Sequence, residues 1–168
     1  LMNTNPDIEI AAFIEEPEEE TLEVLYSLNQ ENTPEVGSLS STESLKNLIQ
    51  LSAINFYVLH EEEIIGFIIC LREGSDYHSL NYKFFSNSEQ KFLYIDRVVI
   101  KNSFRRKGAG TFLYNHLSSI AHKEKLPLCC EVNTIPKNTA SLNFHEKNGF
   151  IETGGHNFED HSVIYLKK

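Results

Sequence analysis

A run of basic residues followed by glycines lies in the second half of the chain. Arg105-Arg106-Lys107 leads into Gly108-Ala109-Gly110, after the apolar stretch "YIDRVVI" and before a segment with helical spacing of apolar residues. Glycine lets the backbone adopt positive φ and approach a ligand closely, and the start of a helix carries partial positive charge. Such a strand-turn-helix suits a pyrophosphate, to which the basic side chains add charge-assisted hydrogen bonds. A basic surface turn before a helix explains the same residues.

Spacing and charge exclude other polyanion-binding motifs. A Walker A loop needs Gly-Lys-Ser/Thr after an earlier glycine, and neither this pattern nor the GxGxxG fingerprint is present. The net charge is −9 over 168 residues, whereas a nucleic-acid-binding protein has a basic footprint. We therefore expect no nucleic-acid partner. A negative field favours a cationic substrate through steering.

The elements that must position this turn follow from the hydrophobic pattern. The expected strands are residues 7–14, 55–60, 63–71, 91–100, 126–133, 149–154 and 161–168. The expected helices begin at Pro17, Thr42, Gly108 and Asn138, and residues 72–90 are expected to form a long polar-aromatic loop that could contain a short helical turn. This order predicts an α/β (α+β) fold with a mixed sheet of six to seven strands flanked by about four helices. We expect one domain over residues 1–168.

Two segments resemble those of a known family. Residues 105–110, "RRKGAG", match the Arg/Gln-x-x-Gly-x-Gly/Ala signature of GNAT-superfamily N-acetyltransferases. Residues 138–150, "NTASLNFHEKNGF", resemble the family's Asn-x-x-(Ala/Ser)…Tyr-Glu-x-x-Gly-Phe ending, and the predicted element order resembles the GNAT fold along essentially the whole chain. The resemblance, to a poorly characterised bacterial subgroup, implies an acyltransferase that uses acetyl-CoA as co-substrate and needs no metal.

The same resemblance implies where acetyl-CoA binds. Backbone groups of Val98, Val99 and Ile100 would hold the thioester, with a strand bulge directing an N–H at its carbonyl as an oxyanion hole does. Asn138 matches an asparagine at the cofactor arm, and Ser141 lies one turn further on. The pyrophosphate would lie on Arg105, Arg106, Lys107, Gly108, Ala109, Gly110 and Thr111. A buried strand explains Val98–Ile100 equally, and the two interpretations are compatible.

Candidate catalytic residues lie on two segments. His145 stands where many relatives have a tyrosine, so it could protonate the departing sulfur, order that sulfur, or only cap a pocket. Tyr94 and Asp96 share one face of their strand, and Tyr94 stands where the histone-acetylating branch has a glutamate. We expect Asp96 to assist water-mediated deprotonation or to hold a substrate ammonium. Its alternative is an ion pair with Arg97 or Arg72.

Candidate substrate contacts are more scattered. Glu131 and Asn133 are expected on alternate sides of the next strand, Glu131 paired with Arg97 and Asn133 near the substrate. The predicted substrate residues are Asn29, Tyr77, Asn81, Tyr82 and Asn133, because tyrosine and asparagine combine apolar area with hydrogen bonds. Tyr77 and Tyr82 could equally cover the core.

The resulting hypothesis is transfer of an acetyl group to a primary amine of a small or amino-acid-like molecule. The alternatives are a protein N-terminal or lysine acetyltransferase and a non-catalytic acyl-CoA-binding regulatory module. Cys70, Cys129 and Cys130 give no disulfide framework and fit buried side chains in a reducing compartment, so we expect a cytoplasmic protein. No apolar run reaches membrane length, and C-terminal edge strands could support a homodimer.

Overall fold

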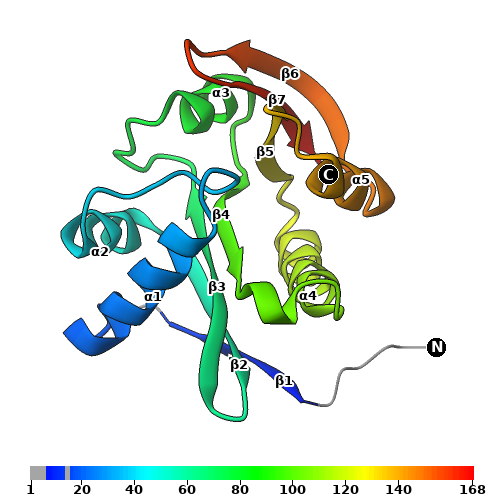
Figure 1. The fold of residues 1–168 in the computed structure, drawn as a ribbon. Coiled ribbons are helices and arrows are strands. Elements are labelled where there is room, and N and C mark those ends of the chain that lie inside the picture. The colour runs from blue at the N-terminus through cyan, green and yellow to red at the C-terminus, as the bar shows by residue number, and fades with distance from the viewer. Residues whose placement is uncertain (1–6, 14–15) are drawn as a thin grey trace.

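The computed structural model describes residues 7–13 and 16–168. Within these residues, one sheet has the strand order β1-β2-β3-β4-β5-β7-β6, with β4 and β5 parallel and every other pair antiparallel (Figure 1). The strands are β1 (Ile8–Ala12), β2 (Ile54–His60), β3 (Glu63–Arg72), β4 (Leu93–Ile100), β5 (Leu128–Ile135), β6 (Ile151–Asn157) and β7 (Ser162–Lys167). The helices are α1 (Glu19–Glu31), α2 (Thr42–Leu51), α3 (Leu80–Ser88), α4 (Ala109–Glu124) and α5 (Thr139–Lys147), and a short 3-10 turn, η1 (Asn102–Phe104), precedes α4.

The mixed α/β sheet expected from the sequence is confirmed, and the segment expected to be a loop with at most a short helical turn contains a full helix. Residues 72–90 contain α3, which Ser79 caps by accepting a hydrogen bond from the Tyr82 amide at 3.3 Å. The segment has few strong helix formers, so burial of Tyr82 and Phe85 stabilises the helix more than intrinsic propensity does. At the other end of the chain, Ile14, predicted to close the first strand, lies outside the described residues.

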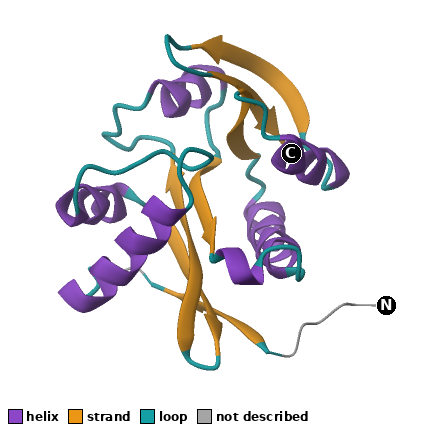
Figure 2. Ribbon diagram, viewed as in Figure 1, coloured by secondary structure: helices purple, strands orange, loops and turns teal. Residues whose placement is uncertain are grey.

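Helices cover both faces of the sheet (Figure 2). On one face, Leu25 of α1 and Leu45 of α2 share an apolar cluster with Phe67 of β3. On the other face, Leu113 of α4 shares a second cluster with Ile68 of β3. Phe67 and Ile68 are neighbours whose side chains leave the strand on opposite sides, as the period of two requires. β3 is therefore the centre of two separate cores.

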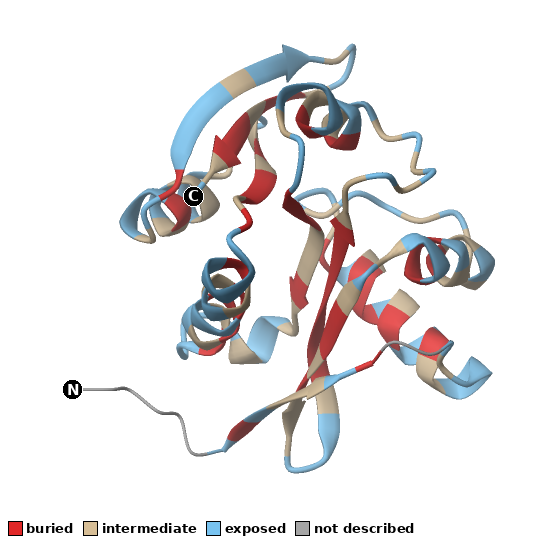
Figure 3. Cartoon of the chain, turned by 180° about the vertical axis from the view of Figure 1, so that it is seen from behind, coloured by how far each residue is buried: buried red, intermediate tan, exposed pale blue. Residues whose placement is uncertain are grey.

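Burial falls from the centre of the sheet to its C-terminal edge. β3 is buried from Ile65 to Leu71, whereas β6 is exposed along nearly its whole length (Figure 3). The polar residues that interrupt this buried centre of the sheet are therefore the ones that need an explanation.

Among the described helices, none combines the length and apolar character needed to cross a bilayer.

The sheet opens between its two parallel central strands. β4 and β5 pair only at Leu93 with Leu128 and at Tyr94 with Cys129, so the following backbone of β4 has no strand partner on that side. The other edge of β4 carries a bulge at Asp96, because Ile95 and Arg97 pair with consecutive residues of β3. A bulge re-aims side chains and is common next to active sites.

Candidate active site

A cavity of about 1150 Å³ lies where β4 and β5 separate. Its volume exceeds the roughly 300–1,000 Å³ of a typical small-ligand pocket, so it has room for two reactants. Its walls come from β4, β5, the loop of residues 32–38 between α1 and α2, the turn before α4, the start of α5 and the turn between β6 and β7. We call the part beside the turn before α4 the donor half. The part between residues 32–38 and the β6–β7 turn is the acceptor half.

The donor half is built around the start of α4. Gly108 precedes the helix with φ +83°, a conformation that strains any residue with a Cβ, and no side chain caps the helix. The first amides of α4 are therefore available to an anion, and the helix dipole favours negative charge there. Gly110 differs, because an added Cβ would meet the Phe144 ring at an ordinary 3.8 Å. Protein packing does not require that glycine.

Most of the predicted pyrophosphate-binding residues line the cavity. They are Arg105, Arg106, Gly108, Gly110 and Thr111. Two do not: Ala109 is buried in the core, and the Lys107 ammonium lies 5.6 Å from the centroid of the Phe104 ring. Arg105 also reaches across the cavity wall, where its Nη2 donates a hydrogen bond to the Oδ1 of the buried Asn32. The donor turn is thereby joined to the loop of residues 32–38.

The predicted thioester strand and cofactor arm lie on the same cavity. Val98 and Ile100 line it, while the side chain of Val99 lies in the core on the opposite face of β4. Asn138 and Ser141 also line it, and the Asn138 side chain caps α5 by accepting the Ser141 amide at 3.2 Å. Backbone groups of β4 that face the cavity lack a strand partner on β5, as a thioester-binding edge requires.

Glu131 is the most perturbed carboxyl group on the cavity. Its Oε2 accepts a hydrogen bond from the Tyr94 hydroxyl at 2.7 Å, and its Oε1 accepts one from Asn81 Nδ2 at 3.3 Å. The Tyr165 hydroxyl in turn donates to Asn81 Oδ1 at 2.9 Å. Burial, reinforced by the nearby negative charge of Asp96, raises the pKa of Glu131 to about 8. A carboxyl group with that pKa can gain and lose a proton near neutral pH.

Asp96 is held by protein partners. Its Oδ2 accepts a hydrogen bond from Arg97 Nε at 2.8 Å and its Oδ1 accepts one from the Tyr77 hydroxyl at 2.7 Å. The bulge at Asp96 allows these consecutive β4 residues to pair. The alternative of an Asp96–Arg97 ion pair is therefore confirmed, and the expected Glu131–Arg97 pair is wrong. Arg72 pairs with Glu73 and Glu124 instead.

His145 is buried and uses both ring nitrogens. Its Nδ1 lies 2.7 Å from the Ser141 carbonyl oxygen, which can only accept, so Nδ1 carries the hydrogen. Its Nε2 then accepts the Tyr114 hydroxyl at 2.8 Å. Burial lowers the pKa of His145, which favours the neutral ring. In this arrangement the ring has no spare hydrogen to give to a leaving group.

The predicted substrate residues divide into two groups. Asn81 and Asn133 line the cavity. Glu131 lines it too, so the expectation that Glu131 and Asn133 lie on alternate sides of β5 is wrong, because residues two apart in a strand share one face. Asn29 is fully buried and bonds to protein groups, and the Tyr77 hydroxyl is taken by Asp96. The prediction that Tyr82 contacts substrate is wrong. Tyr82 is 2% exposed and its hydroxyl donates to the Arg72 carbonyl at 2.7 Å, so it covers the core, as the alternative had it.

Sequence reasoning missed the part played by Glu131 and several loop residues. Glu131 had a signal, because a carboxylate inside the apolar run "LCCEV" needs a reason to be there. Asp160, His161 and residues 34–38 reach the cavity from loops whose composition carries no signal of their position. In the part of the chain that the structure describes, no group of histidine, cysteine or acidic residues is arranged to hold a metal ion.

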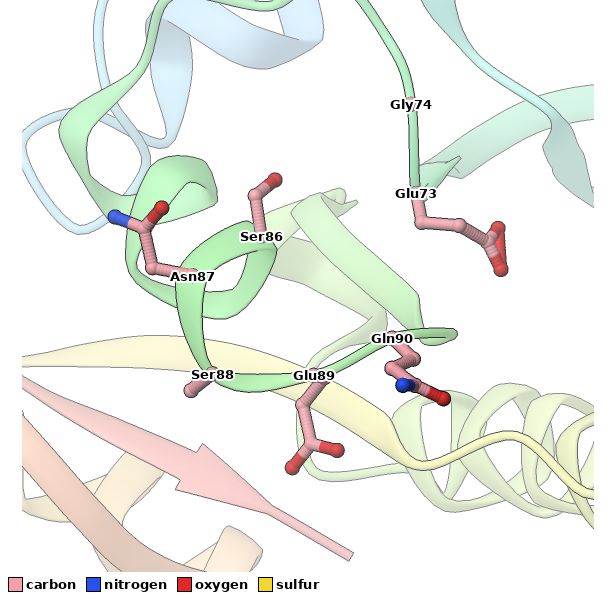
Figure 4. Close-up of a pocket in the computed structure, with 7 residues that line it drawn as sticks. All are labelled: Glu73, Gly74, Ser86, Asn87, Ser88, Glu89 and Gln90. Atoms are coloured by element: carbon pink, nitrogen blue, oxygen red, sulfur yellow. The ribbon is translucent and has the colours of Figure 1, made fainter.

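A second hollow, of about 460 Å³, is shown in Figure 4 and shares no lining residue with the large cavity. Its lining comes from the end of β3 and the end of α3: Glu73, Gly74, Ser86, Asn87, Ser88, Glu89 and Gln90. Both of its carboxylates are engaged, Glu73 with Arg72 at 2.8 Å and Glu89 with Lys167 at 2.6 Å. The large cavity is therefore the candidate active site.

The family model described as the acetyltransferase (GNAT) family matches residues 22–150. Solved structures match over nearly the full chain. The ribosomal-protein-S18-alanine N-acetyltransferase from Escherichia coli is 17% identical, with a TM-score of 0.70 and coverage of 95% of this chain and 92% of that chain. Arabidopsis thaliana Naa50 in complex with the bisubstrate analogue CoA-Ac-MVNAL is 19% identical, with a TM-score of 0.69 and coverage of 96% and 98%. An IAA acetyltransferase from Bacillus cereus is 14% identical, with a TM-score of 0.63 and coverage of 95% and 97%.

Proposed function

Because the chain belongs to the acetyltransferase (GNAT) family, and so is an acyltransferase that uses acetyl-CoA, we propose that it acetylates a primary amine of a small, amino-acid-like molecule. One observation carries the proposal. The uncapped start of α4 and the unpaired edge of β4 open into the same cavity as Glu131, a carboxyl group with a pKa of about 8. An anion site, a carbonyl-binding edge and a proton acceptor thus share one space.

In the proposed donor complex, the first amides of α4 and the Arg106 side chain bind the pyrophosphate of acetyl-CoA. The thioester lies along β4, where backbone N–H groups near Val98 stabilise the charge that develops on its carbonyl oxygen. Asn138 and Ser141 contact the part of acetyl-CoA that joins its pyrophosphate to its thioester. These contacts use residues that already line the cavity.

The proposed chemistry is direct transfer. The lone pair of a neutral amine attacks the thioester carbonyl carbon, an amide C–N bond forms, the C–S bond breaks, and CoA leaves as a thiolate that takes a proton from solvent. The Glu131 carboxylate accepts the proton that the amine nitrogen loses, directly or through one water. Tyr94 and Asn81 orient the two oxygens of that carboxylate. This replaces Asp96, which is held by Arg97 and Tyr77, as the proposed base.

A second acceptor class is the α-amine of a peptide. The Naa50 structure holds an analogue that joins CoA to a peptide, and the E. coli relative is named for an alanine of ribosomal protein S18. The acceptor half here is bordered by exposed residues of two loops, such as Glu35 and Asp160, which leaves a path for a longer chain. Small amines and short peptides are therefore both tested.

Two measurements test the proposal. Isothermal titration should show acetyl-CoA binding, and no detectable heat at millimolar ligand would end it. Thiol release should then be followed with a panel of amines, amino acids and short peptides. A protein that binds acetyl-CoA but releases no thiol with any acceptor would be a non-catalytic acyl-CoA-binding module, contrary to the proposal.

The proposed setting is cytoplasmic. Cys70, Cys129 and Cys130 are free and buried, and burial raises the pKa of each thiol. Buried, protonated thiols of this kind fit a role in packing. Free thiols of this kind suit a reducing compartment. Localisation of the tagged protein by cell fractionation checks this.

A further inference from the structure

Arg97 has donors that the protein does not use. Its Nε donates to Asp96, and its Nη1 donates to Asn29 Oδ1 at 2.8 Å and to the Gly37 carbonyl at 3.1 Å. A guanidinium has five N–H donors in a fixed fork. Within the described residues, the two N–H groups on Nη2 have no acceptor. The side chain is only 9% exposed, so bulk solvent does not fully hydrate these donors.

The spare donors of Arg97 belong to a residue that lines the cavity. In the described part of the chain, Asn55 Oδ1 is the single buried side-chain polar atom without a hydrogen-bond partner. Nη2 of Arg97 is therefore not sealed inside the protein, and Arg97 lines the cavity. A nearly buried cation in the wall of the cavity, with two N–H groups that protein acceptors leave unused, is available to an acceptor from outside the protein.

The protein fixes the plane of this guanidinium. Asn29 is fully buried, and its Nδ2 also donates to the Gly37 carbonyl at 3.1 Å, so Asn29 and Arg97 both donate to this one carbonyl of the loop. Asp96 balances the charge, and the Tyr77 hydroxyl holds Asp96 in turn. A guanidinium held this way loses little conformational entropy when it binds a ligand.

Arg97 and Glu131 face the same half of the cavity from different strands. Arg97 lies on β4 and Glu131 on β5, and both line the space where these strands have separated. They are near enough for the positive charge of Arg97 to lower the pKa of Glu131, against the larger effect of burial. The acceptor half therefore offers one group for an amine and one for an oxygen.

We propose that Arg97 Nη2 anchors an oxygen of the carbonyl or carboxylate group that is attached to the amine-bearing α-carbon of the acceptor. This oxygen belongs to the carboxylate of a free amino acid or to the first carbonyl of a peptide. The inference rests on the proposed function and names the acceptor as an α-amino acid derivative. It assigns Arg97 a contact with substrate, and Asn29, predicted as a substrate contact, a positioning role.

Matched acceptors test this inference. Three sets are used, built on alanine, phenylalanine and lysine, and each contains the amino acid, a dipeptide that begins with it, and its decarboxylated amine. In the wild type we expect kcat/KM to be at least about 100-fold higher for the best carbonyl-bearing member than for the decarboxylated amine, because the anchor is left unpaired by the latter. Preference for the acid identifies a free amino acid, and preference for the dipeptide identifies a peptide terminus.

Arg97→Lys should remove most of this preference, to within about tenfold, because one ammonium cannot serve Asp96, Asn29 and the substrate together. Arg72→Lys is the matched control, since Arg72 is also an ion-paired arginine but does not line the cavity. It should keep the wild-type preference. Equal turnover of decarboxylated and carbonyl-bearing amines by the wild type overturns the inference while leaving the proposed function intact. Failure of every amine despite acetyl-CoA binding contradicts the proposed function itself, and the inference with it.

A binding measurement gives a readout apart from turnover. With CoA present, calorimetry should show N-acetylphenylalanine or its peptide analogue binding at least about tenfold more tightly than N-acetylphenethylamine. If Arg97→Lys does not fold, Asn29→Asp replaces it. That variant keeps an oxygen for Nη1 but adds a second carboxylate to the guanidinium, so carboxylate binding should fall at least about tenfold with acetyl-CoA affinity unchanged. Unchanged carboxylate binding in the folded variant contradicts the anchor.

Discussion

The two halves of the cavity are built from different kinds of chemistry. The donor half uses backbone: the amides at the start of α4 and the unpaired edge of β4, which are close together in the sequence. The acceptor half uses side chains that come from distant segments, including Asn29 of α1, Arg97 of β4 and Glu131 of β5. The donor half therefore depends on chain conformation, and the acceptor half depends on the identity of single side chains.

This difference has consequences for how each half fails. A substitution in the donor half should act through φ or through charge next to a phosphate, and should spare the proton chemistry. A substitution in the acceptor half should spare acetyl-CoA binding, because no acceptor side chain supports the start of α4. Arg105 is the exception, since it joins the donor turn to Asn32 in the loop of residues 32–38.

Gly108→Asp should give the largest effect and should be confined to the donor half. Aspartate brings a negative charge beside the phosphates and a Cβ to a position with φ +83°. One repulsive contact near a protein surface is of the order of 4 kcal/mol, so acetyl-CoA affinity should fall about 1000-fold by calorimetry.

Gly74→Asp is the matched control for this substitution. Gly74 has φ +80° and open space around it, as Gly108 does, but lies outside the cavity. Both variants should lose similar thermal stability, and only Gly108→Asp should lose affinity. Equal affinity loss in both would show that backbone strain, and not the phosphate site, is responsible.

Glu131→Gln should break the acceptor half alone. Glutamine keeps the shape and an oxygen for the Tyr94 hydroxyl but cannot accept the proton of the amine, so kcat should fall by about 100-fold or more at unchanged acetyl-CoA affinity. In the pH–rate profile of the wild type, the rate should fall below a pH of about 8, where Glu131 becomes protonated. This acidic limb of the profile should be absent in the variant.

Acceptors of different basicity separate the enzyme's limb from that of the substrate amine. The limb of Glu131 should stay in place when the acceptor is changed, whereas the limb of the amine should move with it. Glu152→Gln, an exposed glutamate on β6, serves as the control. If Glu131→Gln retains full turnover and the same acidic limb of the pH–rate profile, then Asp96 or water accepts the proton and Glu131 does not.

How much the sequence could predict follows the same division. Residues 105–111 carry their function in local order, so glycine, basic residues and a following helix could be recognised together. The sequence offered Arg97 and Arg72 as alternative partners of Asp96, and the choice of Arg97 needed the bulge in β4, because alternation along a regular strand would place Asp96 and Arg97 on opposite faces. Tyr82 and Tyr77 look alike in sequence, and only packing separates a core residue from one that holds Asp96.

Asn81→Leu should have a smaller effect that tests the orientation of Glu131. The Asn81 side chain donates to Glu131 and thereby lowers its pKa, so removing it should raise the pKa further and move the limb to higher pH, by about one unit. The measurement is the pH profile of kcat. Asn87→Leu on the same helix is exposed and should leave the profile unchanged. A limb that moves to lower pH would contradict the contact.

His145→Ala should give the smallest effect on chemistry and a larger one on stability. The neutral ring spends its hydrogen on the Ser141 carbonyl and accepts from Tyr114, so its loss leaves a buried Tyr114 hydroxyl without that partner. We expect the melting temperature to fall by several degrees, as about 1–3 kcal/mol requires in a chain of this size, and kcat at saturating substrate to fall less than about tenfold. His122→Ala, exposed near the end of α4, should change neither. A fall of 100-fold or more in kcat with an intact melting temperature would show that His145 supplies a proton after all. In that case proton transfer would involve His145 of α5 as well as Glu131 of the acceptor half.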